Sequence, residues 1–135
     1  MNMIRRPRRL RSSQSVRDLV HEVDIAVEDL MYPMFVVEGE NIKEEIPSMP
    51  GIYHYSLDQL KEALEKVVEA GILAVMYFGI PDHKDEVGSE AYNPEGIVQR
   101  AISMTKEYFP DLIVAADICL CEYTSHGHCG VIHHG

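Results

Sequence analysis

The sequence lacks any apolar run near the roughly 20 residues that a membrane-spanning helix needs. Its first residues contain no apolar segment like that of a secretory signal, so we expect a protein that is not exported. Glycine and proline together make up only 16 of 135 residues, too few for a disordered low-complexity chain. Three cysteines are an odd number and a poor basis for a disulfide framework. We therefore exclude the membrane, collagen-like and disulfide-scaffold classes and expect a cytoplasmic location.

Short motifs for nucleotide binding and for a nucleophilic serine are missing as well. The chain contains no GxGxxG, no P-loop and no GxSxG. What remains is a chain of 135 residues with 46% hydrophobic and 25% charged residues. These values are ordinary for a soluble domain with one core. A complete (β/α)8 barrel usually needs roughly 250 residues, so the chain is too short for one.

Charge is distributed unevenly along the chain. Residues 1–17 carry six arginines and no acid, whereas the remaining residues hold the other six bases and all 22 acids. A basic arm on an acidic body can bind nucleic acid or a membrane surface, or it can lie against an acidic face of its own or a neighbouring subunit. Nucleic-acid-binding domains usually have a basic body too. We therefore favour docking within or between subunits, and expect neither a nucleic-acid nor a membrane partner.

We divide the chain into two parts, an arm with a short helix at 1–28 and one domain at 29–135. Within the first part, residues 1–17 are predicted to be extended and residues 18–28 to form the helix. In the second part, apolar runs predict buried strands at 30–37, 72–80 and 112–118. Helical periodicity predicts one helix from Ser56 to Gly71 and another from Asn93 to Pro110. This order predicts an α/β fold of parallel βαβ units, in an open sheet or a barrel.

Local signals define the ends of the predicted helices. Ser56 and Gln59 match a capping box, and Gly71 is a typical C-terminal stop. Asn93 is a typical N-cap, followed by Pro94 at the first helical position.

Two stretches are less regular. Pro33 argues against a central place in the sheet for the strand at 30–37 and suggests that part of this strand pairs irregularly. Residues 38–55 are predicted to be a long polar connection, a length that is often functional or contact-forming.

Side chains able to do chemistry gather in one segment, DICLCEYTSHGHCG, at residues 117–130. The segment begins where the third predicted strand ends, at the edge where parallel α/β folds collect ligands and catalytic groups. Cys119 and Cys121 are two residues apart, so their thiols point to the same side of an extended chain, and Cys129 returns after a gap containing Gly127. Three thiolates suit zinc and leave a fourth position open, as in catalytic sites. Such an ion is suited to orienting a substrate amine or carbonyl.

Other interpretations of this segment stay open. His126 or His128 can complete the coordination and make the zinc site structural. The CxC pair by itself can be a redox dithiol, and Asp117 can be a plain turn or cap residue. Tyr123 and His126 are expected to pack and hydrogen-bond behind the ligands rather than to bind the ion.

The segment closely resembles the metal loop of the porphobilinogen synthase family, also called δ-aminolevulinic acid dehydratase. Further stretches agree in the same order along the chain: RRPRRLR, MYPMFVVEGE, SMPGIYHYSLDQL, FGIPDHKDEVGSEAYNPEGIVQRAI and FPDLIVAADICLCEYT. The likeness runs from about Arg5 to Val131. It implies a TIM (β/α)8 barrel, of which residues 29–135 would form about three βα units. It also implies an N-terminal arm that embraces a neighbour in a homo-octamer.

The resemblance further implies a reaction and its site. The family condenses two 5-aminolevulinate molecules to porphobilinogen with loss of two waters, in tetrapyrrole (heme) biosynthesis. Cys119, Cys121 and Cys129 match the ligands of the catalytic Zn²⁺ in the zinc-dependent branch. The resemblance also leaves room for a Mg²⁺ ion at another site of the full-length enzyme. Asp117 matches an acidic residue near the reacting amine. His128 matches a position behind the ligands, or an alternative metal position in some members.

One departure from the family is large. Its two Schiff-base lysines lie on later strands, and no lysine of this chain has the buried strand-end setting that Schiff-base chemistry needs. The lysines are Lys43, Lys61, Lys66, Lys84 and Lys106. Because family members are more than twice as long, we expect an incomplete enzyme that is inactive alone and unstable or self-associating. The alternative is a non-enzymatic zinc-binding or interaction module that keeps the metal loop.

Overall fold

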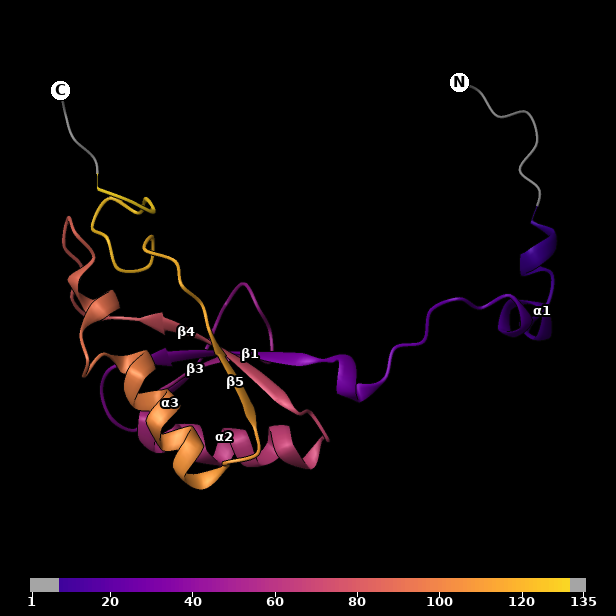
Figure 1. Ribbon diagram of the computed structural model, residues 1–135, viewed down its shortest axis with the longest axis horizontal. Coiled ribbons are helices and arrows are strands. Elements are labelled where there is room, and N and C mark those ends of the chain that lie inside the picture. Colours follow the sequence, from indigo (N-terminus) through magenta and orange to yellow (C-terminus); the bar gives the residue numbers. More distant parts are fainter. Residues whose placement is uncertain (1–7, 132–135) are drawn as a thin grey trace, which may run out of the picture.

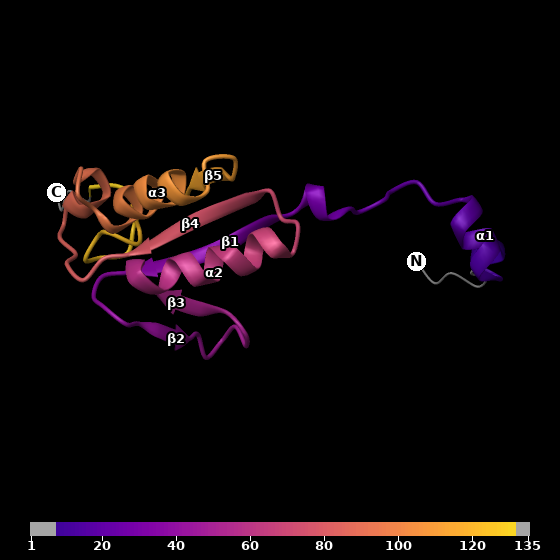
Figure 2. The same ribbon diagram turned by 90° about the horizontal axis from the view of Figure 1, so that it is seen from below.

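The fold is a five-stranded sheet with two helices on one face (Figures 1 and 2). The computed structural model describes residues 8–131. The strands are β1 (Met31–Val37), β2 (Lys43–Glu45), β3 (Tyr53–Tyr55), β4 (Ala74–Ile80) and β5 (Ile113–Ala116). The α-helices are α1 (Gln14–Leu19), α2 (Leu57–Glu69) and α3 (Ile97–Tyr108). Short 3₁₀ helices are η1 (Arg9–Arg11), η2 (Val27–Asp29) and η3 (Ser89–Tyr92).

The strands lie in the order β2-β3-β1-β4-β5. All neighbours pair in parallel except β2 and β3, which are antiparallel. Helix α2 precedes β4, and α3 connects β4 to β5, so the predicted βαβ order of β1, β4 and β5 is confirmed. Because parallel strands end at the same edge of a sheet, the chain leaves β1, β4 and β5 on one side of the molecule.

The core lies between the sheet and these two helices. Met34 and Val36 of β1 and Val75 and Tyr77 of β4 alternate along their strands and are at most 1% exposed. They contact the apolar stripes of α2 and α3, whose buried members are Leu60, Ala63, Leu64, Val67, Ile97, Val98 and Ala101. Burial of a large apolar side chain contributes about 1.5–3 kcal/mol. This packing holds two helices that are too short to be stable in isolation.

The opposite face of the sheet carries aromatic side chains. Phe35 of β1 and Phe78 of β4 are cross-strand partners whose rings stack with centroids 5.3 Å apart. Both rings are only partly buried, and within residues 8–131 no helix covers this face (Figure 1).

Pro33 lies in a central strand, so the expectation of a non-central place for the strand at 30–37 is wrong. Strand β1 is the third of five and lies between β3 and β4. However, β3 pairs only with Phe35 and Val36, so Pro33 lies beyond that ladder and its missing N–H removes none of those hydrogen bonds. The irregular pairing that the proline indicates is therefore present.

The polar stretch 38–55 contains more structure than predicted. Strands β2 and β3 form an antiparallel hairpin there, with Lys43 opposite Tyr55 and Glu45 opposite Tyr53. Each strand has only three residues, and every residue of β2 is exposed. The hairpin therefore leaves no apolar run in the sequence.

Helix α2 begins after Ser56 as predicted, but the capping box does not form. The Oγ atom of Ser56 accepts a hydrogen bond from the backbone N–H of Ile42 (2.8 Å) and donates one to the carboxylate of Asp58 (2.6 Å). This hydroxyl therefore fastens the chain that follows β1 instead of capping α2. At the other end, Gly71 has φ +79° and stops the helix, as predicted.

Helix α3 begins three residues later than predicted, at Ile97. The side-chain oxygen of Asn93 accepts a hydrogen bond from the N–H of Glu95 (3.0 Å), and its carbonyl accepts one from Gly96 (2.9 Å). Asn93 therefore builds a separate turn, and Gly96 is the N-cap. The helix ends before Pro110, as predicted.

The arm also differs from the prediction. The helix there is α1, with Ser13 as its N-cap accepting from the N–H of Val16 (3.2 Å), whereas residues 21–26 have no regular structure. A capping side chain precedes residue 14 but not residue 18, which explains the shift. Figure 1 shows α1 well apart from the sheet. The division at residue 28 remains a prediction.

Within residues 8–131, no helix is both long and apolar enough to cross a membrane.

Candidate metal centre

The candidate site begins at the carboxyl end of β5. The N–H of Asp117 donates to the carbonyl of Tyr77 on β4 (3.0 Å), which extends the pairing of the two strands by one residue. Ala116 packs on the core, so by strand alternation Asp117 faces the side of the sheet opposite the helices. Its side chain is half-buried. After it, the chain turns, with the N–H groups of Tyr123 and Thr124 both bonded to the carbonyl of Leu120 (3.0 Å each).

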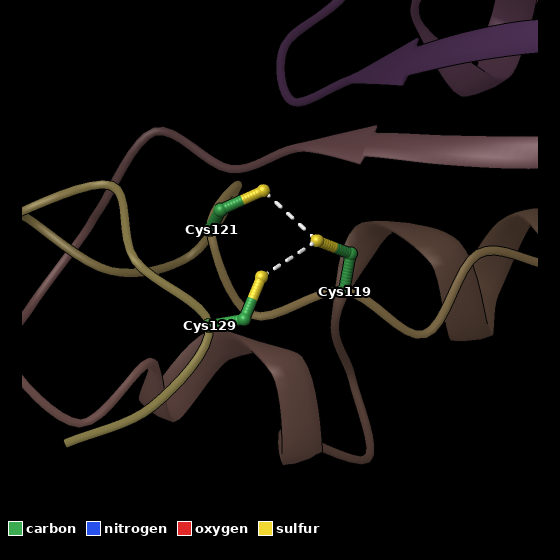
Figure 3. Close-up of side chains that lie close together, drawn as sticks. All are labelled: Cys119, Cys121 and Cys129. Atoms are coloured by element: carbon green, nitrogen blue, oxygen red, sulfur yellow. Dashed lines mark hydrogen bonds between the residues drawn. The ribbon is translucent and has the colours of Figure 1, made fainter.

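This turn brings the three cysteines together (Figure 3). The Sγ atom of Cys119 lies 2.9 Å from that of Cys121 and 3.2 Å from that of Cys129. All three sulfur atoms lie within 4.8 Å of one another. Cys119 and Cys121 are half-buried, whereas Cys129 is exposed. The three thiols therefore lie close together, as their spacing in the sequence predicts.

The thiols affect one another's ionisation. Hydrogen bonding with Cys121, and then with Cys129, raises the pKa of Cys119 to about 12. The hydrogen bond from Cys119 lowers the pKa of Cys129. A proton thus stays longest on the central sulfur, and Cys129 becomes a thiolate more readily. A cation that replaces this proton removes the repulsion between the sulfurs.

The donor set fits zinc. Sulfur ligands at about 2.3 Å from a tetrahedral Zn²⁺ are about 3.8 Å apart, so the observed separations need only small side-chain movements. Three soft thiolate donors favour zinc over magnesium or calcium, which prefer oxygen. Within residues 8–131, no histidine nitrogen or carboxylate oxygen belongs to this group of ligand atoms.

Tyr123 supports the loop from behind. It is 7% exposed, and a β-carbon on Gly79 of β4 would lie 2.5 Å from its phenol oxygen. Burial, followed by the charges of Glu122 and Asp117, raises the pKa of this phenol. Tyr123 therefore packs against β4, as predicted from the sequence, whereas the hydrogen bond expected of it is not found among the described residues.

His126 and His128, which the sequence predicts to lie behind the ligands, are on the outer part of the loop. Their rings stack with centroids 5.7 Å apart, and the N–H of His128 donates to Nδ1 of His126 (3.2 Å). The Nε2 atom of His126 lies 3.2 Å from the carbonyl of Glu86. His128 is exposed. Their role behind the ligands stays a prediction, and His133 and His134, for which we predict no catalytic role, lie outside the described residues.

Sequence reasoning missed part of the site, the segment 81–92 after β4. Its Asp85 pairs with Thr124 in a parallel bridge, and its carbonyl accepts from the N–H of Ser125 (2.8 Å). The aspartate-to-serine spacing of Asp85 and Ser89, with Gly88 between them, was a signal for a fixed turn. Glu122 was missed as well: burial and the charge of Asp117 raise its pKa, and Lys84 opposes this.

Comparison with known proteins identifies the family. The family model described as "Delta-aminolevulinic acid dehydratase" matches residues 4–135. The chain belongs to the delta-aminolevulinic acid dehydratase family. It is 52% identical over 131 residues to a member from Halalkalibacterium halodurans, covering 97% of this chain and 40% of that protein. It is 50% identical over 130 residues to a member from Ruminiclostridium josui, covering 96% of this chain and 63% of that protein.

A solved structure agrees with these relatives. The crystal structure of delta-aminolevulinic acid dehydratase (porphobilinogen synthase) from Toxoplasma gondii, in complex with the reaction product porphobilinogen, aligns with a TM-score of 0.84 at 40% identity. The alignment covers 97% of this chain and 38% of that one. The fold class, about three βα units of a TIM barrel preceded by an arm, is thereby confirmed. The chain spans about two fifths of the length of two of these relatives and 63% of the length of the third.

Proposed function

We propose that this chain is the zinc-binding part of a porphobilinogen synthase, a hydro-lyase of heme biosynthesis in the cytoplasm. Its substrate would be 5-aminolevulinate, of which two molecules condense to porphobilinogen with loss of two waters. The observation that supports this most is the group of three sulfur atoms within 4.8 Å of one another, at the carboxyl edge of β5, in a chain of this family.

The cysteines would hold the catalytic ion. Cys119, Cys121 and Cys129 are its ligands in this proposal, and Zn²⁺ so bound would polarise or orient a substrate oxygen or amine at its open position. Asp117 lies two residues before Cys119 and faces the side of the sheet that carries Phe35 and Phe78. A half-buried carboxylate at that place is suited to hold or accept the proton of a substrate amine.

The lysines of this chain favour a whole enzyme in which another part of the protein supplies the Schiff-base lysines. All five are exposed, and two are held by other groups: Lys66 Nζ bonds Glu62 (2.6 Å), and Lys106 Nζ bonds the Leu112 carbonyl (2.6 Å). An exposed amine lacks the desolvated pocket that activates a Schiff-base lysine. This favours an inactive fragment when residues 1–135 are tested alone. The same observation supports the second candidate, a non-enzymatic zinc-binding module.

The arm is proposed to bind a neighbouring subunit of a homo-oligomer, which the family resemblance implies to be an octamer. Its apolar side chains are unusually exposed, with Leu19 at 84% and Ile25 at 80%. Apolar side chains with such exposure, on a segment that lies apart from the sheet, are typical of a contact with another chain.

Two measurements test the proposal. Zinc content should be one ion per chain and should be lost when Cys119 and Cys121 are both changed to serine. Porphobilinogen should form from 5-aminolevulinate in the full-length protein and not with residues 1–135. A zinc-binding full-length protein without synthase activity would favour the second candidate, and a reversible Cys119–Cys121 disulfide without bound zinc would overturn both in favour of a redox dithiol.

A further inference from the structure

The return half of the cysteine loop, residues 124–130, is attached to the rest of the molecule at one place. Within the described residues, its hydrogen bonds to chain outside the loop end on Asp85 and Glu86. The N–H of Ser125 donates to the carbonyl of Asp85 (2.8 Å), and Nε2 of His126 lies 3.2 Å from the carbonyl of Glu86. The position of the third thiol therefore depends on the segment that follows β4.

Asp85 fixes the conformation of that segment with its side chain. Its Oδ1 atom accepts from the N–H groups of Val87 (3.1 Å) and Ser89 (2.9 Å), and its Oδ2 atom accepts from the hydroxyl of Ser89. These bonds lower the pKa of the carboxyl group, the hydroxyl of Ser89 most of all, so it is ionised at neutral pH. The same residue thus organises its own turn and offers its carbonyl to the cysteine loop.

The turn is also shaped to the loop that it contacts. Gly88 has φ +65°, and a β-carbon there would lie 3.4 Å from side-chain atoms of Leu120 and Thr124. Thr124 is 3% exposed, and its hydroxyl donates to the carbonyl of His128 (3.0 Å), the residue before Cys129. A continuous set of contacts therefore runs from the carboxylate of Asp85, through Thr124, to the third cysteine.

We propose that Asp85 is a positioning residue for the metal centre, which holds Cys129 beside Cys119 without binding the ion itself. This inference rests on the proposed zinc-binding role of the three cysteines. Loss of the carboxylate releases the turn at 85–89, and the return half of the loop then moves away from Cys119. Two cysteines remain close to each other, because Cys119 and Cys121 belong to the other half of the loop.

The test compares variants of the full chain by two metal readouts. Zinc affinity is measured by competition with a chromophoric chelator, and Co²⁺ substitution reports, through its thiolate charge-transfer absorption per bound ion, how many cysteines bind. Asp85→Ala should lower zinc affinity by about 10- to 100-fold, the usual effect of losing a group that orients ligands. It should also reduce the cobalt band from a three-thiolate to a two-thiolate intensity.

Matched variants separate positioning from loss of charge. Asp82→Ala removes the same charge from an exposed site on the same segment and should leave both readouts unchanged. Asp85→Asn keeps an oxygen that can accept from Val87 and Ser89, so it should restore most of the affinity. Ser89→Ala removes only one donor and should lower affinity by a smaller factor.

Each outcome decides the matter. If Asp85→Ala binds zinc and cobalt as the unchanged chain does, the inference is wrong. If Asp85→Ala has lost the helical circular dichroism of the unchanged chain, Ser89→Ala is used as the test variant instead. Unchanged zinc affinity of Ser89→Ala would then contradict the inference. An unchanged chain that binds no zinc instead contradicts the proposed function, which keeps the two failures distinct.

Discussion

Tyr123 of the cysteine loop lies directly over Gly79 of β4. A β-carbon on Gly79 would come within 2.5 Å of the phenol oxygen and of the Cγ2 atom of Val98. The absence of a side chain at this one strand position therefore lets the loop and α3 both approach β4. Because Gly79 does not have a positive φ, this requirement is one of space and not of backbone conformation.

Gly79→Ala should push the cysteine loop outward. We expect a loss of about 1–3 kcal/mol in the free energy of unfolding, as for other overpacked positions, together with weaker zinc binding. Urea unfolding and chelator competition measure the two effects.

Tyr123→Phe provides the control for this substitution. It removes the phenol oxygen, which has no hydrogen-bond partner among the described residues, so it should change little by itself. Combined with Gly79→Ala it should recover part of the loss, because one of the two close contacts disappears. Strict additivity of the two changes would show that Tyr123 does not lie where we describe it.

Tyr77 and Thr105 form a buried hydrogen bond of 2.6 Å. The hydroxyl of Thr105 donates to the carbonyl of Ala101 (2.7 Å), so the hydroxyl of Tyr77 is the donor between the two. Tyr77→Phe should cost about 1 kcal/mol, the net value of one hydrogen bond. Thr105→Val should cost more, about 1–3 kcal/mol, because it leaves a buried phenol without a partner. Urea denaturation of both variants tests this order, and a larger loss for Tyr77→Phe would contradict the direction of the bond.

The same tyrosine predicts a weakness at alkaline pH. Burial raises the pKa of Tyr77 from 10.0 to about 12 in the folded protein. The unfolded chain therefore releases this proton first, so the contribution is complete below pH 10 and is lost as the pH rises toward 12. The free energy of unfolding should fall through this range by up to about 3 kcal/mol more than in Tyr77→Phe, which cannot ionise there. Parallel pH curves for the two proteins would show that the phenol is not buried.

Residues 1–135, expressed alone, should self-associate. Within the described residues β5 pairs only with β4, and Ile113, the first residue of this edge strand, is 58% exposed. Edges of this kind pair with other chains. Ile113→Lys should shift the sedimentation profile toward the monomer, whereas Leu19→Lys, on the arm, should test whether the arm drives association instead. A monomeric unchanged chain at tens of micromolar would contradict the expectation.

Strong local patterns made most of the fold predictable. Strand β4 is buried on the helix side, β5 packs its Val114 and Ala116 partly buried against the core, and both strands read as apolar runs. Gly71 stops α2 because its backbone readily adopts the required φ. The hairpin of β2 and β3 was not predictable, because strands of three residues are too short to carry a periodicity. Likewise, Asn93 has the side chain of an N-cap, but it forms a tight turn with Glu95 and Gly96 before the helix begins. No local pattern distinguishes these two uses of an asparagine.

The metal centre shows the same limit at the level of single residues. The spacing of Cys119, Cys121 and Cys129 was enough to predict that the three thiols meet, since a strand end and a glycine-containing return leave little else. The contact of Asp85 with Thr124 joins segments far apart in sequence. It depends on how the loops after β4 and β5 fold against each other, which no local pattern in the sequence indicates.

The backbone around Cys129 has a consequence for where the third sulfur can lie. Cys129 is exposed and lies between Gly127, with φ +72°, and Gly130, with φ +155°. Residues with a β-carbon rarely adopt these backbone angles, so the path that returns the chain to Cys119 depends on glycine at both positions. A bulkier residue at either position would strain this path and displace the third sulfur, while Cys119 and Cys121 stayed in place.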